Sequence, residues 1–285
     1  MARAPAKINL FLHVGDKRAD GFHALQSLVA FTEAGDDLAF APDDALTLAI
    51  DGPFGAELSA GDDNLVVKAA RVFEPALGAA KGAHITLTKN LPVASGIGGG
   101  SADCAATLRG LNALWGLGLD TAALQEIGAS LGSDVPVCIT CQPQWMEGRG
   151  EILTELPALP DLAVVLVNPG VGVPTGKVFG ALKERRGVGL PLPPKFASAD
   201  DLVAYLKDTA NDLEAPARVI APVIGDVLDF IAGQGALLSR MSGSGATCFG
   251  LFENGTHAAR AAEAIRAAHP GWWAVASRLS GRIYD

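Results

Sequence analysis

The chain has 285 residues, of which 49% are hydrophobic and 19% charged, so it can bury a sizeable core and does not have the composition of a disordered protein. Its formal net charge of −9 argues against a general nucleic-acid binder, which needs Lys and Arg to neutralise backbone phosphates. No uncharged run reaches the ~18 residues of a membrane span. Because Lys7, Asn9 and His13 interrupt any apolar stretch that a signal peptide would need, we expect a cytoplasmic protein.

The cysteines are too few and too scattered for a disulfide framework in a chain of this length. Cys138 and Cys141 form a C-x-x-C motif, but no second pair accompanies them. Ordinary packing of reduced, buried thiols is therefore favoured over a metal or redox role, and no protein metal site is expected.

In the N-terminal half, residues 7–14 alternate with the period of a half-buried strand, which would place Lys7 and Asn9 on one face. A turn is expected at Asp20-Gly21, and Asp134-Val135-Pro136 should open an extended segment. The expected helices are 62–77, capped by Asp62 or Asp63, a second from about residue 101, and 121–131; the other expected strands are 25–31 and 83–88.

In the C-terminal half, the proline-containing segment 157–160 is predicted to link two domains, 1–156 and 157–285. The pattern beyond it is mixed α and β, without an internal repeat. The expected helices are 175–183, 199–207, 216–232 and 256–268, and the expected strands are 162–167, 236–240, 247–252 and 272–279.

A glycine-rich run leads directly into the predicted helix near residue 101, and its glycines would let backbone N–H groups approach a phosphate. The helix N-terminus adds unpaired donors and a favourable dipole. A flexible turn or close strand-to-helix packing is the alternative interpretation. The candidate phosphate-binding residues are Pro92, Val93, Ala94, Ser95, Gly96, Ile97, Gly98, Gly99, Gly100, Ser101 and Ala102.

Two familiar nucleotide motifs do not fit this run. The Walker motif requires Gly-Lys followed by Ser or Thr, but Gly176-Lys177 is followed by Val178. The dinucleotide motif G-x-G-x-x-G fails because Ser101 stands where the third glycine belongs. The run therefore belongs to a third kind of phosphate loop.

With the segments 4–10 and 241–246, the glycine-rich run resembles the superfamily of galactokinase, homoserine kinase, mevalonate kinase and phosphomevalonate kinase. Within it, the segments 4–10, 20–23, 91–106, 132–136 and 242–246 are similar to the branch that acts on 4-diphosphocytidyl-2-C-methyl-D-erythritol. The resemblance implies an α+β fold of two domains, an N-terminal half like ribosomal protein S5 domain 2 and a ferredoxin-like C-terminal half, with the active site in the cleft between them. It also implies ATP-dependent phosphorylation of the substrate's 2-hydroxyl in the non-mevalonate isoprenoid pathway, with Mg²⁺ held mainly by the nucleotide.

The resemblance implies two catalytic residues. Asp134 would be the general base or the orienting acceptor for the 2-hydroxyl, and Lys7 would keep it ionised and correctly turned. Asn9 would bind a substrate hydroxyl from the same face as Lys7. The alternatives are a loop carboxylate bonded to nearby backbone for Asp134 and a solvated strand charge for Lys7.

Further ligand contacts are implied at both ends of the substrate. Phe22 and His23 stand where the family usually has Tyr-His, so the His23 edge and the Phe22 ring would receive the cytosine, without the hydrogen bond of a phenol. Lys89 resembles a family lysine near the ligands. The alternative for Phe22 is an aromatic residue of the core, and the alternative for Lys89 is an exposed loop lysine. The alternative for residues 242–246 is a plain hairpin turn. The remaining candidate contacts are Pro174, Thr175, Gly243 and Ser244.

Two other functions compete with this one. A homoserine or mevalonate type of kinase would share the phosphate loop, but the contexts of Phe22-His23 and Asp134 argue against it. A nucleotide-binding regulator without turnover would have no chemical need of Lys7 and Asp134, both of which the chain retains.

Overall fold

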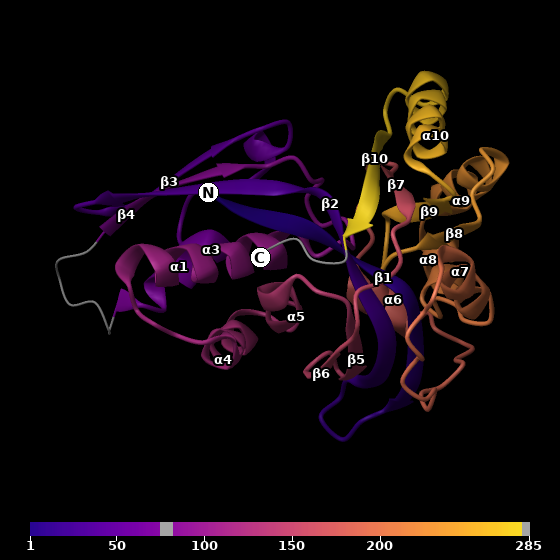
Figure 1. Cartoon of the computed structure of the whole chain (residues 1–285), viewed down its shortest axis with the longest axis horizontal. Helices are drawn as coiled ribbons and strands as arrows, with labels where there is room; N and C mark the ends of the chain where they lie inside the picture. The colour runs from indigo at the N-terminus through magenta and orange to yellow at the C-terminus, as the bar shows by residue number, and fades with distance from the viewer. Residues whose placement is uncertain (75–81, 281–285) are drawn as a thin grey trace. The chain divides into compact units, whose positions relative to one another are not determined.

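The computed structural model describes residues 1–74 and 82–280, and it divides into two compact units. The first comprises Met1–Ala6, Gly35–Val93 and Gly98–Cys141, and the second comprises Lys7–Ala34, Ala94–Ile97 and Gln142–Asp285. Two long strands, β1 (Ala2–Lys17) and β2 (His23–Asp43), contribute residues to both units (Figure 1). The predicted division after residue 156 stays a prediction.

The first unit contains a sheet built on the second half of β2. Strand β4 (Gly82–Thr88) lies in the middle of it, antiparallel to residues 37–43 of β2 and parallel to β3 (Leu46–Asp51). The predicted strand 83–88 is thus confirmed, whereas β3 was missed. A 3-10 turn, η1 (Gly55–Glu57), follows β3.

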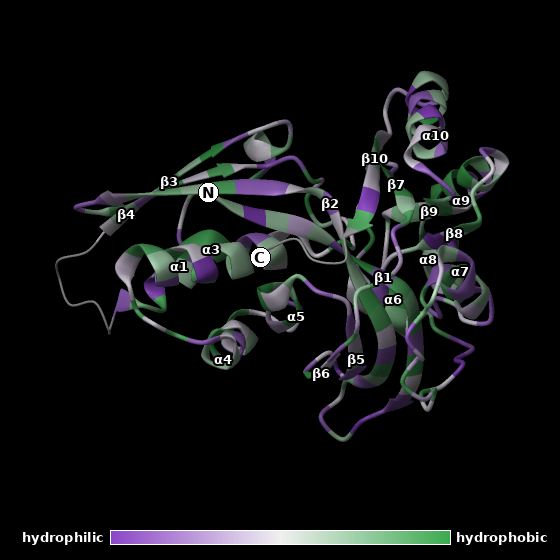
Figure 2. Ribbon diagram, viewed as in Figure 1, coloured by the Kyte–Doolittle hydropathy of each residue, from purple (hydrophilic) through white to green (hydrophobic). Residues whose placement is uncertain are grey.

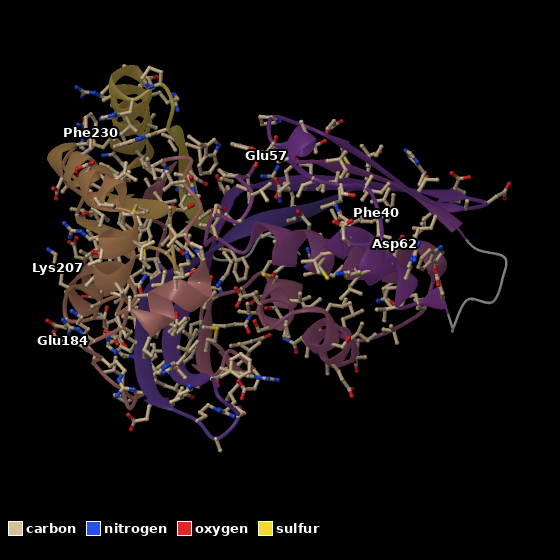
Figure 3. The ribbon with its side chains drawn as sticks, turned by 180° about the vertical axis from the view of Figure 1, so that it is seen from behind. Phe40, Glu57, Asp62, Glu184, Lys207 and Phe230 are labelled. Carbon is tan, nitrogen blue, oxygen red and sulfur yellow. The ribbon has the colours of Figure 1, made fainter. Side chains whose placement is uncertain are left out.

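Helices pack against one side of this sheet, as Figure 1 shows for α1 and α3. Among the described residues, the helices of the first unit are α1 (Leu65–Arg71), α3 (Gly99–Trp115), α4 (Thr121–Leu131) and α5 (Val135–Thr140). A side chain on Gly110 of α3 would overlap the ring of Phe40, a β2 residue labelled in Figure 3. Glycine at this position therefore allows α3 to approach the sheet closely.

The first predicted helix begins later than expected. The side chain of Asn64 accepts a hydrogen bond from the backbone N–H of Val66 over 2.9 Å and so caps α1. Asp62, predicted as a cap, instead pairs with Arg71 over 2.6 Å. The predicted C-terminal end of this helix, at Leu77, lies outside the described residues.

The segment that starts with Asp134-Val135-Pro136 is helical, so the prediction of an extended segment was wrong. Asp134 is the N-cap residue of α5, and Pro136 occupies the first turn of the helix. Proline is well accommodated there because its missing N–H would have no partner within the helix. The helix ends at Cys141, which has a φ of 51° in the left-handed region.

Strand β1 is buried on both faces rather than on one. Residues 4–15 are all buried, including Lys7 and Asn9. The alternation did predict a strand correctly. It could not predict the burial of the polar face, because that depends on what packs over it.

Antiparallel strands of the second unit pair with its part of β2 at two places, residues 25–29 and residues 31–32. Strand β7 (Ala163–Asn168) lies between β10 (Trp273–Ser280) and β9 (Cys248–Phe252), and β8 (Leu238–Met241) pairs with β9. Strand β5 (Gln144–Gly148) pairs with residues 25–29 of β2 and with β6 (Ile152–Glu155). Neither β5 nor β6 was predicted.

Helices cover the β7–β10 strands of this unit. Helix α9 (Val223–Gly233) packs against β8 and β9, and α10 (Gly255–Ala268) packs against β7 and β10. Figure 2 shows how strongly hydrophobic α9 is. The other helices are α6 (Thr175–Gly180), α7 (Ala199–Lys207) and α8 (Glu214–Ile220).

One predicted helix of the second unit is two helices. The predicted span 216–232 is interrupted between α8 and α9, where Pro222 is the N-cap residue of α9. Proline disfavours a helical conformation in the residue before it, so the first helix ends there. Within the described residues, no helix combines the length and apolar character needed to cross a membrane.

Candidate active site

Lys7 and Asn9 form a buried polar pair on β1. The Lys7 ammonium nitrogen Nζ donates a hydrogen bond to Asn9 Oδ1 over 3.2 Å. The two residues are only 3% and 1% exposed, so the interpretation of Lys7 as a solvated strand charge was wrong. Burying an ammonium group costs free energy unless polar partners surround it. The buried Lys7–Asn9 pair therefore marks a candidate functional site.

The turn after β8 reaches the same strand. The backbone N–H of Asn9 donates to Ser242 Oγ over 3.2 Å, and the Ser242 hydroxyl donates to the carbonyl of Gly96 over 3.1 Å. The N–H of Lys7 donates to the carbonyl of Ile97 over 2.9 Å. Three segments far apart in the sequence therefore meet within the second unit.

Glycine is required where the glycine-rich run meets the turn. Gly96 has a φ of +80°, and a Cβ atom on it would lie 2.6 Å from the carbonyl oxygen of Gly245. A Cβ atom on Gly243, whose φ is +56°, would lie 2.9 Å from the carbonyl oxygen of Gly96. The alternative interpretation of close backbone packing thus holds for Gly96, and residues 242–246 are more than a plain hairpin turn.

The glycines that follow lead into a helix with an open N-terminus. Gly98, with a φ of 64°, is the N-cap residue of α3 and offers no side chain to cap it. The helix itself starts at Gly99 and continues through Gly100, Ser101 and Ala102. The first N–H groups of a helix have no partner inside it, and they suit an anion such as a phosphate. Phosphate binding here stays a prediction, as it does for Pro92 and Val93 just upstream.

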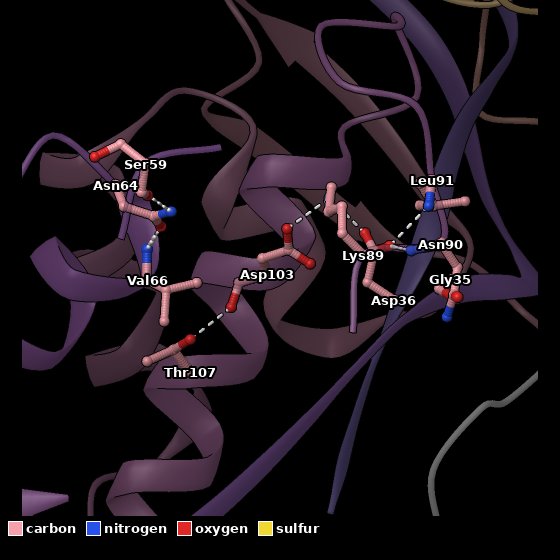
Figure 4. A network of polar contacts seen from close by, with 10 residues as sticks. All are labelled: Gly35, Asp36, Ser59, Asn64, Val66, Lys89, Asn90, Leu91, Asp103 and Thr107. Carbon is pink, nitrogen blue, oxygen red and sulfur yellow. Dashed lines mark hydrogen bonds and ion pairs between the residues drawn. The ribbon is translucent and has the colours of Figure 1, made fainter. Parts of the chain in front are cut away.

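Lys89 belongs to a buried charge cluster of the first unit, shown in Figure 4. Its Nζ lies 2.5 Å from Asp36 Oδ2 and 2.6 Å from Asp103 Oδ2, and the lysine is 2% exposed. The interpretation as an exposed loop lysine was therefore wrong. A Cβ atom on Gly99 would lie 3.2 Å from Nζ, which places the ammonium group beside the first residue of α3.

Burial and the neighbouring charges shift the pKa values of this cluster in opposite directions. Burial would lower the pKa of Lys89, but the carboxylates of Asp103 and Asp36 outweigh it and raise that pKa. Burial raises the pKa of Asp103 to about 8, although the Lys89 ammonium counteracts it. Asp36 Oδ1 accepts hydrogen bonds from the backbone N–H groups of Asn90 and Leu91, whereas Asp103 Oδ1 has no hydrogen-bond partner in the part of the chain that the structure describes.

Neither acidic residue of the cluster, Asp36 or Asp103, was predicted from the sequence. Asp103 lies among Ala102, Cys104, Ala105 and Ala106, a buried and otherwise apolar stretch of α3. An acidic residue within such an apolar stretch was the sequence signal that could have indicated a buried charge at Asp103. Its partner lysine could not be identified without the fold, because Lys89 and Asp103 come from different elements.

The residues predicted for the cytosine lie in the second unit. Phe22 is 54% exposed, with the Arg149 guanidinium carbon 5.4 Å from its ring centroid, so the core-aromatic interpretation was wrong. The His23 ring stacks on Phe179 with centroids 5.6 Å apart, and its Nδ1 lies 3.1 Å from the carbonyl oxygen of Gly15. Because a carbonyl only accepts, Nδ1 carries a proton, and the Nε2 edge is left for other partners. Phe179 was not among the residues predicted for the site.

Two more predicted contacts meet each other. The hydroxyl oxygens of Thr175 and Ser244 lie 2.8 Å apart. Thr175 is the first residue of α6 and Pro174 is its N-cap residue, whereas Ser244 lies beside Gly243 in the turn after β8. The structure thus joins the predicted contact residue Thr175 of α6 to the predicted contact residue Ser244 of the turn after β8.

Asp134 belongs to the first unit, whereas Lys7 belongs to the second. It is half-buried, and its side chain makes no capping hydrogen bond to α5. Its partnership with Lys7 stays a prediction.

The cysteines are buried, as expected, and none of them forms a disulfide: Cys104, Cys138, Cys141 and Cys248. Cys141 Sγ lies 3.1 Å from the carbonyl oxygen of Cys138, and burial raises the pKa of the Cys104 thiol to about 12. A thiol with such a pKa is a poor nucleophile and metal ligand at neutral pH. Within residues 1–74 and 82–280, no group of three or more His, Cys, Asp or Glu side chains is arranged to hold a metal ion.

Comparison with known proteins agrees with this geometry. The family model "GHMP kinases N terminal domain" matches residues 64–142, and "GHMP kinases C terminal" matches residues 197–271. Together with the mixed α and β units and the three converging segments, these matches define a GHMP kinase fold.

The relatives narrow the class. The chain is 52% identical to 4-diphosphocytidyl-2-C-methyl-D-erythritol kinase of Cereibacter sphaeroides (strain ATCC 17025 / ATH 2.4.3), over 98% of this chain and 99% of that protein. It is 49% identical to the kinase of the same name from Ruegeria pomeroyi, over 98% of both chains. A crystal structure of 4-(cytidine 5'-diphospho)-2C-methyl-D-erythritol kinase superposes with a TM-score of 0.80 at 34% identity, covering 98% of this chain and 99% of that one. The chain therefore belongs to the family of 4-diphosphocytidyl-2-C-methyl-D-erythritol kinases.

Proposed function

We propose that the protein transfers the γ-phosphoryl group of ATP to the 2-hydroxyl of 4-diphosphocytidyl-2-C-methyl-D-erythritol. The products are ADP and the 2-phosphate of the substrate, a step of the non-mevalonate isoprenoid pathway. The observation that carries the proposal is the buried Lys7–Asn9 pair, which the Ser242 hydroxyl links to Gly96 in the glycine-rich run.

Phosphoryl transfer needs alignment and charge stabilisation more than covalent chemistry from the protein. In the proposed mechanism, Asp134 accepts the hydrogen bond of the 2-hydroxyl and orients its oxygen toward the γ-phosphate. The Lys7 ammonium orients the Asp134 carboxylate and stabilises the charge that develops on the transferred group. Asn9 holds Lys7 and contacts the substrate.

The nucleotide phosphates would lie at the N-terminus of α3, where Gly98 leaves the first N–H groups uncapped. Lys89 would contribute to the electrostatic potential at this N-terminus rather than bind the phosphates directly, because Asp36 and Asp103 already bind its ammonium group. Mg²⁺ would be held mainly by phosphate oxygens of ATP, which are its usual ligands in kinases.

The cytosine would bind beside His23. The Nε2 edge of His23 presents a hydrogen-bonding group, and Phe179 already stacks on its ring. The exposed Phe22 ring provides a second flat surface. The Thr175–Ser244 contact would close this region from α6 and the turn after β8.

The test is to incubate the protein with Mg-ATP and, separately, the diphosphocytidyl substrate, homoserine and mevalonate, and to follow ADP release. We expect ADP only with the diphosphocytidyl substrate. Turnover with homoserine or mevalonate instead would assign the protein to another acceptor, and no ADP with any alcohol would favour a nucleotide-binding regulator.

A further inference from the structure

Ser27 carries a fully buried hydroxyl group on β2, and the partners of this hydroxyl allow only one assignment of hydrogen-bond donors and acceptors. It is 0% exposed and is followed by the buried apolar residues Leu28 and Val29. Its Oγ lies 2.5 Å from the carbonyl oxygen of Phe11 and 2.8 Å from Asn9 Nδ2. A carbonyl only accepts, so the single hydroxyl proton of Ser27 goes to Phe11, and the lone pairs of Oγ remain for Asn9.

This arrangement determines how the Asn9 amide is turned. With its Nδ2 toward Ser27, Asn9 presents Oδ1 to the Lys7 ammonium, 3.2 Å away. If the amide were flipped, an N–H donor would face the ammonium group, and the amide oxygen would face a hydroxyl whose proton is already used. Both hydrogen bonds would be lost, so Ser27 excludes the flipped orientation.

We infer that Ser27 is a positioning residue that acts on Lys7 through the Asn9 amide, so that the Lys7 ammonium is oriented before substrate binds. This inference rests on the proposed function, in which Lys7 and Asn9 act on the acceptor. The four residues concerned, Lys7, Asn9, Phe11 and Ser27, all lie in the second unit. Preorientation of this kind matters because a small misplacement of a catalytic group costs on the order of a hundredfold in rate.

The kinetic test compares Ser27→Ala with the matched control Thr32→Val. Thr32 is another fully buried hydroxyl of β2, and it bonds to the carbonyl of Ala34 instead of to the site. We expect Ser27→Ala to lower kcat with the acceptor by roughly ten- to a hundredfold, with the KM for ATP unchanged, whereas Thr32→Val lowers stability without changing kcat. Ser27→Thr, which keeps the hydroxyl, should restore much of the rate.

A double-mutant cycle shows whether Ser27 acts through Asn9. In an Asn9→Ala background, Ser27→Ala should cause little further loss, because the amide that it orients is gone. Additive losses, or an equal loss of kcat in Thr32→Val, would overturn the inference. If Ser27→Ala does not fold, Ser27→Cys serves in its place, because a thiol of similar shape forms only weak hydrogen bonds.

A second readout does not depend on turnover. The Asn9 side-chain amide signal in a ¹H–¹⁵N spectrum, assigned by its absence in Asn9→Ala, should move in Ser27→Ala and stay in place in Thr32→Val. An unmoved signal in Ser27→Ala would overturn the inference even if the kinase reaction is confirmed. A wild-type protein that releases no ADP would instead overturn the proposed function, while this signal still decides the orientation of Asn9.

Discussion

Asp134 carries the proposed chemistry from the N-terminal end of α5, where its side chain is half-buried and does not cap the helix. Replacing it with asparagine keeps the shape but removes the charge and the ability to take a proton. We expect Asp134→Asn to bind Mg-ATP with nearly unchanged affinity and to lose at least about a hundredfold in turnover. Nucleotide titration and ADP release measure the two effects, and near-normal rates would remove Asp134 from the mechanism.

Asp103 makes stability depend on pH with a predictable sign. Its pKa is raised from 3.8 to about 8, mainly by burial, so the folded chain holds a proton that the unfolded chain releases at lower pH. This contribution to stability is complete below the ordinary pKa of 3.8 and is lost as pH rises through about 8. We expect the free energy of unfolding of Asp103→Asn to lack this decline.

Urea unfolding of wild type and Asp103→Asn at pH 5, 6, 7 and 8 measures the difference, and the stability of wild type relative to the variant should fall as pH rises. If the stability of wild type relative to Asp103→Asn instead rose with pH, Asp103 would be ionised in the folded chain. Lys89 would then hold two carboxylates instead of one carboxylate and one acid.

The contact between the glycine-rich run and the turn after β8 depends on glycine at position 96. Gly96→Ala would bring a Cβ atom to 2.6 Å from the Gly245 carbonyl oxygen, at a φ of +80°. We expect a loss of about 1–3 kcal/mol in the free energy of unfolding and a lower rate of ADP release. Gly233→Ala, at the end of α9 with nothing within 4 Å, is the matched control and should be neutral or slightly stabilising. Equal effects of the two substitutions would contradict the proposed packing.

For the chain as a whole, ligand binding should add to stability by mass action. A ligand at a hundred times its Kd stabilises the folded state by about 2.7 kcal/mol if it does not bind the unfolded chain. We expect Mg-ATP to raise the unfolding midpoint of wild type, and to raise that of Asp134→Asn by a similar amount. Gly96→Ala should show a smaller increase, because its substitution disturbs the phosphate loop. Thermal unfolding with and without Mg-ATP measures all three.

Much of the secondary structure was predictable because its signals are local. The helices 121–131 and 199–207 have the predicted bounds, and proline, glycine and apolar spacing lie within each segment. Strands β3, β5 and β6 were missed because a short strand is stabilised by the neighbours with which it pairs. The same limit applied to Asp134-Val135-Pro136, where a proline suits either an extended segment or the first turn of a helix.

The sequence by itself determined the family, and it supplied the candidates for the phosphate loop and for the site residues Lys7, Asn9, His23 and Asp134, because motifs preserve residue types in order along the chain. Only the tertiary structure decided that Lys7 is buried, that Lys89 is bound by Asp36 and Asp103, and that Ser27 orients Asn9. The physical reason is that burial, pKa and hydrogen-bond direction depend on which groups meet in space. Those groups come from distant parts of the chain, and no local pattern specifies them.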